Sequence, residues 1–64
     1  MFAIQCPAAG YLVGYVRTTE GRRPVFDRNK RQAECYATRR HAAEGKAKAE
    51  QTVLPGPLAV VKVS

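Results

Sequence analysis

Residues 27–51 read DRNKRQAECYATRRHAAEGKAKAEQ, and the way this stretch folds decides the architecture of the whole chain. It carries seven of the eleven lysine and arginine residues: Arg28, Lys30, Arg31, Arg39, Arg40, Lys46 and Lys48. Apolar, strand-like segments flank it on both sides. Two interpretations of the stretch compete, and each gives the flanking segments a different surface to pack against.

The first interpretation is one long helix over residues 28–51. Asp27 precedes it as the predicted N-cap, because a carboxylate can accept hydrogen bonds from the free N–H groups of the first helical turn. Alanines and Tyr36 would then share one face, but Arg40 would fall in the centre of that face. Gly45 in the middle of the helix would cost about 1 kcal/mol relative to alanine.

The second interpretation, which we favour, divides the stretch into a turn over residues 28–33, a short strand over residues 34–37 and a helix over residues 39–51. Thr38 becomes the N-cap of that helix, and Arg40 leaves the core. A stripe of small residues then lines one side of the helix and suits close packing on a sheet. Its members are Ala42, Gly45, Ala49 and Val53.

The flanking segments predict four strands, at residues 2–6, 11–17, 22–26 and 58–63, because β-branched and aromatic residues dominate them. Gly14 indicates a bulge inside the second strand, and Gly21 a turn that needs positive φ. Pro24 cannot donate a ladder hydrogen bond, so the third strand is expected to lie at a sheet edge or to begin at the proline. We therefore expect one α+β domain over residues 1–64, with a small antiparallel β-sheet of three to five strands packed against one main α-helix.

A chain of 64 residues has a small core, which supplies only about 3–5 kcal/mol of stability, so a partner would add to its stability. Its two cysteines allow at most one disulfide. The first residues lack the basic and apolar regions of a signal peptide, and no segment has the ~20 apolar residues of a membrane span. We expect a cytoplasmic protein with reduced thiols.

The net charge of +6 provides the best functional signal. A clustered positive field attracts nucleic acid or an acidic protein surface. Arginines at the tip of the predicted hairpin and cations on one helix face would form the contact surface. The candidate binding residues are Arg17, Arg22, Arg23, Arg28, Arg39, Arg40 and Lys46. Tyr11, Tyr15 and Tyr36 would stack on bases if exposed, but we expect them to fill the core instead.

No catalytic residues, metal site or cofactor are expected, so the chain is predicted not to be an enzyme. Cys6, Cys35 and His41 have unhelpful spacing for zinc, which usually takes four ligands. We expect both cysteines to be small buried apolar residues and His41 to lie on the surface. No glycine-rich phosphate loop occurs. A membrane partner is not expected either, because the predicted helix would present only alanine to lipid.

The order of elements resembles that of small phage- and prophage-encoded accessory proteins, including several of the anti-CRISPR type. The matching segments are Tyr11-Leu12-Val13-Gly14, Pro24-Val25-Phe26, Ala33-Glu34-Cys35-Tyr36-Ala37-Thr38 and the closing strand from Leu58 to Val63. The resemblance implies a binding protein without catalytic residues. It would inhibit a host nucleic-acid-processing defence complex stoichiometrically, by contacting a host protein or ribonucleoprotein.

Two other functions remain as alternatives. One is direct, non-specific binding to DNA or RNA through the same basic residues. The other is a structural or assembly role, in which copies of the chain form a homodimer or larger homo-oligomer through the sheet edge at residues 24–26. A strict monomer in light scattering would remove the assembly alternative.

Overall fold

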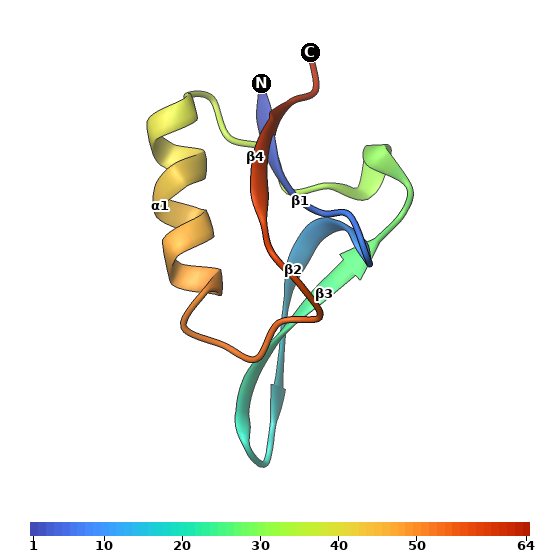
Figure 1. Ribbon diagram of the computed structural model, residues 1–64, viewed down its shortest axis with the longest axis vertical. Helices are drawn as coiled ribbons and strands as arrows, with labels where there is room; N and C mark the ends of the chain where they lie inside the picture. The colour runs from blue at the N-terminus through green and yellow to red at the C-terminus, as the bar shows by residue number, and fades with distance from the viewer.

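The computed structural model describes residues 1–64. In chain order it contains β1 (Phe2–Cys6), β2 (Gly10–Thr18), β3 (Gly21–Asp27), a short 3-10 helix η1 (Lys30–Gln32), α1 (Arg39–Ala49) and β4 (Ala59–Lys62). The strands form one antiparallel sheet in the order β3-β2-β1-β4, and α1 packs against β1 and β4 (Figure 1). The predicted small α+β fold is therefore confirmed.

The second interpretation of residues 27–51 is the correct one. Thr38 caps α1, because its Oγ1 accepts a hydrogen bond from the backbone N–H of His41 at 3.1 Å. The helix ends at Ala49, two residues before the predicted end. The long helix over residues 28–51 is wrong, since residues 33–38 leave helical conformation altogether.

Asp27 does not cap a helix, contrary to the prediction. It is still part of β3, where it pairs with Tyr11. Its Oδ1 accepts from the backbone N–H of Asn29 at 2.6 Å, and Asn29 in turn caps η1 by accepting from the N–H of Arg31. A short polar turn therefore follows the strand directly, and the main helix begins only at Arg39.

Residues 34–36 lie between β1 and β2, where these two strands diverge. Tyr36 and Phe2 exchange two backbone hydrogen bonds, of 2.7 and 2.8 Å, and the N–H of Glu34 donates to the carbonyl of Leu12 at 3.0 Å. The two strands pair directly over only two residue pairs. The strand predicted at residues 34–37 is thus reduced to a single bridge, which fills the opening in the sheet.

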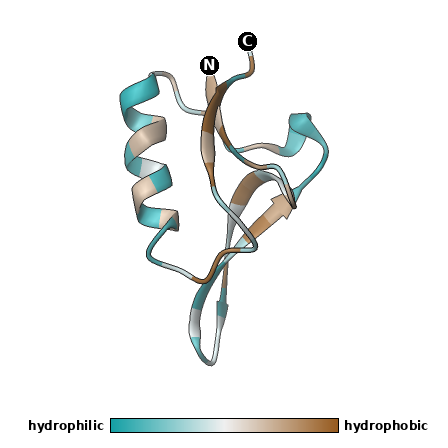
Figure 2. Cartoon of the chain, in the orientation of Figure 1, coloured by the Kyte–Doolittle hydropathy of each residue, from teal (hydrophilic) through white to brown (hydrophobic).

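The buried core is small and lies between the sheet and α1. Its central cluster consists of Ile4, Cys6, Leu12, Ala49 and Leu58. Tyr15 and Tyr36 pack half-buried against it, as predicted for tyrosines that fill the core. Figure 2 shows that the most hydrophobic segments are largely in the strands, whereas α1 alternates between hydrophilic and weakly hydrophobic residues and the hairpin tip is mostly hydrophilic.

The small-residue stripe is only partly correct. Ala42 and Ala49 are fully buried, but Val53 is 80% exposed, because α1 ends before it and helical spacing no longer applies. Leu54 packs against the core instead. The prediction for Cys35 is also wrong, since this thiol is exposed on the 34–36 segment, whereas Cys6 is buried as expected.

The turn and edge predictions are confirmed. The register of the β2–β3 pair shifts between Leu12 and Gly14, as a bulge requires, and Gly21 has φ +117° at the hairpin turn. β3 is an edge strand, in agreement with its Pro24. The sequence did not reveal the role of Gly10, which has φ +109° and lies against the backbone of Asp27.

The two chain ends lie beside each other. The N-terminal ammonium of Met1 donates to the carbonyl of Ser64 at 2.8 Å, and the N–H of Val63 donates to the carbonyl of Met1 at 3.1 Å. The molecule measures 35 × 22 × 18 Å, and the ends lie at one pole of its long axis, with the tip of the β2–β3 hairpin at the other (Figure 1).

Candidate functional site

The seven predicted binding residues do not gather on one surface. Arg17 and Arg22 are direct cross-strand partners near the tip of the β2–β3 hairpin. Arg23 pairs with Val16, and because side chains alternate along a strand, it points to the opposite side of the hairpin. Only the first two of these three arginines therefore share a face.

The predicted helical residues lie away from that hairpin face. At about 100° per residue, Arg39 and Lys46 fall on one flank of the buried Ala42–Ala49 line, and Lys48 on the other. The guanidinium of Arg39 lies 4.9 Å from the centre of the Phe2 ring. The predicted face shared by Arg39 and Lys46 exists, but it is not continuous with the hairpin arginines.

Two of the predicted cations are paired with carboxylates. Lys46 Nζ lies 3.1 Å from Glu50, and Arg40 Nε lies 4.0 Å from Glu44, both at a spacing of four residues along α1. A third, Arg28, donates to the backbone carbonyl of Ala8 at 3.1 Å. These three side chains are therefore already engaged within the protein.

A different group of cations surrounds Tyr15. The guanidinium of Arg22 lies 5.0 Å from the centre of its ring, and Lys48 Nζ lies 6.0 Å from it. Neither cation forms an ion pair, and nor does Arg17. We call Arg17, Arg22 and Lys48 the hairpin patch.

Sequence reasoning missed Lys48 as a site residue. The signal that would have found it is its position on α1, seven residues after His41 on the flank opposite Arg39 and Lys46. The position of Lys48 on the helix can be assigned only if the helix begins after Thr38. Even then, the sequence does not show which flank of the helix faces β2.

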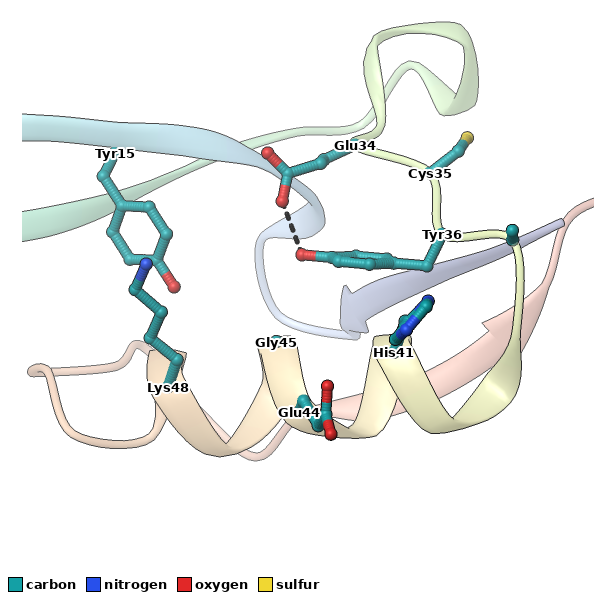
Figure 3. A pocket seen from close by; sticks show the side chains of 9 residues that line it. Tyr15, Glu34, Cys35, Tyr36, His41, Glu44, Gly45 and Lys48 are labelled. Carbon is teal, nitrogen blue, oxygen red and sulfur yellow. Dashed lines mark hydrogen bonds between the residues drawn. The ribbon is translucent and has the colours of Figure 1, made fainter.

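A pocket of about 590 Å³ lies between β2, the 34–37 segment and α1 (Figure 3). Tyr15 and Lys48 line one side of it, and Tyr36 and Glu34 the other. The hydroxyl of Tyr36 donates to Glu34 Oε1 at 2.5 Å. Gly45 forms part of the wall, and the absence of a side chain there gives the Tyr36 ring its place.

A second hollow, of about 390 Å³, lies between the turn of the β2–β3 hairpin and the C-terminal end of α1. Lys48 lines both hollows, and Arg22 and Gly21 line the second. The exposed side chain of Val53 lies at its edge. The two hollows share Lys48, and we call the surface that they form together the groove between the hairpin and α1.

The electrostatics of the pocket keep both tyrosines neutral. Burial raises the pKa of Tyr36 far above its usual value, and the hydrogen bond to Glu34 raises it further, because a tyrosinate would face a carboxylate. Burial also raises the pKa of Tyr15, although the neighbouring Arg22 opposes the change. The pocket thus presents two neutral phenol rings beside a cationic patch.

Replacing Tyr36 by phenylalanine is expected to alter the dependence of stability on alkaline pH. The raised pKa means that the unfolded chain loses its tyrosine proton first, from about pH 10, so the free energy of unfolding of the native protein falls as pH rises above that value. Tyr36→Phe removes this contribution and, at neutral pH, one hydrogen bond worth about 1 kcal/mol.

The measurement is urea denaturation of both proteins between pH 8 and pH 11. All other side chains are the same in the two proteins, so the comparison isolates Tyr36. We expect the native protein to be the more stable one at pH 8 and its advantage to shrink steadily above pH 10. A constant difference across this range would contradict the pKa assignment.

The arrangement offers binding groups rather than a reacting pair. Cys35 and His41 both line the pocket, but no hydrogen bond joins them, and the Cys35 thiol points away from the imidazole (Figure 3). No three histidine, cysteine, aspartate or glutamate side chains lie close enough together to hold a metal ion. His41 is exposed, as predicted.

Comparison with known proteins finds no protein family, no curated protein and no solved structure that matches this chain. The helix of this fold is too short and too polar to cross a membrane. The functional argument therefore rests on the hairpin patch and the groove beside it.

Proposed function

We propose that this protein is a non-enzymatic binding protein whose hairpin patch contacts the phosphates of nucleic acid. The observation that carries the proposal is the convergence of Arg22 and Lys48 on the Tyr15 ring, with Arg17 beside them and no carboxylate bound to any of the three. Cations that have no internal partner can meet a phosphate without first breaking an ion pair.

The charge balance of the chain supports this assignment. The chain has eleven lysine and arginine residues but forms only two salt bridges, so nine of these cations have no carboxylate partner. Each phosphate that such a cation neutralises releases condensed counterions, and this release drives binding at low salt. A polyanion is therefore the partner that this surface favours most strongly.

The test compares two double variants that remove the same charge. Arg17→Gln/Arg22→Gln removes two cations of the hairpin patch, and Arg40→Gln/Lys46→Gln removes the two that are paired with Glu44 and Glu50. Both lower the net charge from +6 to +4. Affinity for a labelled random-sequence oligonucleotide, as single strand and as duplex, is measured by fluorescence anisotropy at several salt concentrations.

We expect the slope of log affinity against log salt to fall by roughly 1.5 to 2 in the hairpin variant and by much less in the control. Equal losses in the two variants would show a response to overall charge, with no defined contact surface. A native protein that binds neither form of the oligonucleotide at low salt would overturn the proposal.

The second candidate is the one that the resemblance implies: an inhibitor of the anti-CRISPR type that contacts the protein component of a host nucleic-acid-processing complex. Its specific support is the apolar side chain of Val53, 80% exposed beside Arg22 and Lys48, because arginine next to exposed apolar surface is common in protein interfaces. If the native protein binds neither oligonucleotide form and is a strict monomer in light scattering, this candidate is favoured.

A further inference from the structure

The groove between the hairpin and α1 has a chemical polarity. Glu34 and Tyr36 line one side of the pocket, Tyr15 and Lys48 line the other, and Glu44 belongs to the wall that α1 provides. Arg22 lines the second hollow, toward the hairpin turn. Lys48 stands where the two hollows meet. One end therefore offers the Tyr36 ring and carboxylate acceptors, the other offers two cations, and the Tyr15 ring lies beside the cations.

We propose that this groove binds single-stranded nucleic acid, with one base seated between Tyr15 and Tyr36 and the adjoining phosphate on Lys48 and Arg22. The inference rests on the proposed function and adds to it the strand form that the site selects. Single-strand binding sites commonly combine a cationic track with aromatic side chains on which bases stack.

The position of the carboxylates orients the ligand. A phosphate at the Glu34–Glu44 end would face the carboxylate of Glu34, which has no cation partner, and that of Glu44, which pairs with Arg40. The backbone is therefore directed to Lys48 and Arg22. A base at that end meets acceptors that suit its N–H groups, because Glu34 uses Oε1 for Tyr36 and its second oxygen is bound to no side chain. The two ends of a nucleotide thus match the two ends of the groove.

The groove should select single-stranded over double-stranded nucleic acid, because only an unpaired base can reach the tyrosine rings. In a duplex the bases are paired and stacked, so their faces cannot reach rings that lie inside a groove, and a duplex can use only the cations. An unpaired base can leave the strand and enter the pocket, whose volume of about 590 Å³ holds a base with room to spare. Both tyrosines are half-buried and line the pocket, so each presents part of its surface to a ligand there.

The experiment uses the full chain with a labelled 12-nucleotide single strand and the matching duplex. Tyr15→Leu removes the aromatic face but keeps an apolar side chain, and Tyr15→Phe restores the face without the hydroxyl. We expect Tyr15→Leu to weaken single-strand binding by about tenfold or more and Tyr15→Phe to bind nearly as the native protein does. The salt slope should stay unchanged in both, since no charge is removed.

Circular dichroism and thermal unfolding establish that the variants are folded, and Lys48→Gln provides a surface variant that does not touch the core. Lys48→Gln should weaken binding of both strand forms and lower the salt slope by about 1. A native protein that binds duplex as tightly as single strand, or a Tyr15→Leu variant that binds single strand normally, would overturn this inference while leaving the proposed function in place. Absence of binding to both forms would overturn the two together.

Discussion

Replacing Gly10 by alanine is expected to destabilise the fold by about 3 kcal/mol, which is comparable with the whole stability available to a chain of this size. Gly10 opens β2 with φ +109°, a conformation that side-chain-bearing residues rarely adopt. An added Cβ would also lie 2.5 Å from the backbone carbonyl oxygen of Asp27 and 2.9 Å from the Cα of Arg28. Backbone cannot swing aside as a side chain can, so strand β3 itself would have to move.

Gly21→Ala is the matched control. Gly21 has φ +117°, close to the value at Gly10, but nothing lies within 4 Å of an added Cβ. This variant pays only the conformational strain, of about 1–2 kcal/mol. Urea denaturation followed by circular dichroism should rank the native protein above Gly21→Ala and Gly21→Ala well above Gly10→Ala. Equal stability of the two variants would mean that the contact with Asp27 is unimportant.

Replacing Gly45 by alanine is expected to have the second large effect on stability. It should destabilise the protein, although helix propensity alone predicts stabilisation. In an exposed helix the change would stabilise by about 1 kcal/mol. Here an added Cβ would lie 2.6 Å from Tyr36 Oη and 2.8 Å from its Cζ. The ring cannot retreat freely, because its hydroxyl is bound to Glu34 and its backbone is paired with Phe2. We expect a net destabilisation of about 1–2 kcal/mol.

The same substitution in a Tyr36→Leu background tests the cause. Leucine lacks the Cζ and Oη atoms that an added Cβ at position 45 would meet. Gly45→Ala should therefore become neutral in this background, or stabilise the protein by up to about 1 kcal/mol. The coupling between the two positions comes from a double-mutant cycle of urea denaturation. Destabilisation of the same size in both backgrounds would show that Gly45 is needed for a reason other than the Tyr36 ring.

Residue pattern was sufficient for most of the fold. The strand at residues 2–6 was predicted with its observed bounds. The cap at Thr38 was predicted because a helix that begins there keeps the charged side chain of Arg40 out of the core. Propensity and capping are local properties, so they are readable along the chain. What the sequence could not supply was where the 34–37 segment docks, because its partners Phe2 and Leu12 are distant in sequence and contribute only backbone groups.

The candidate site was less predictable than the fold. Arg17 and Arg22 were found because a hairpin brings facing positions together. Lys48 and Tyr15 were not joined to them, since the contact between α1 and the hairpin depends on how the helix is rotated over the sheet. Arg40 and Lys46 were included although Glu44 and Glu50 stand four residues after them, a spacing at which charged side chains on a helix do meet.

The closeness of Met1 and Ser64 has a practical consequence. Any peptide fused to either end, whether a purification tag, a fluorescent protein or a natural extension, emerges from the same corner of the molecule. That corner is at the far end of the 35 Å axis from the arginine-bearing loop (Figure 1). The protein can thus be tethered to a sensor chip by one terminus with its cationic end directed into solution.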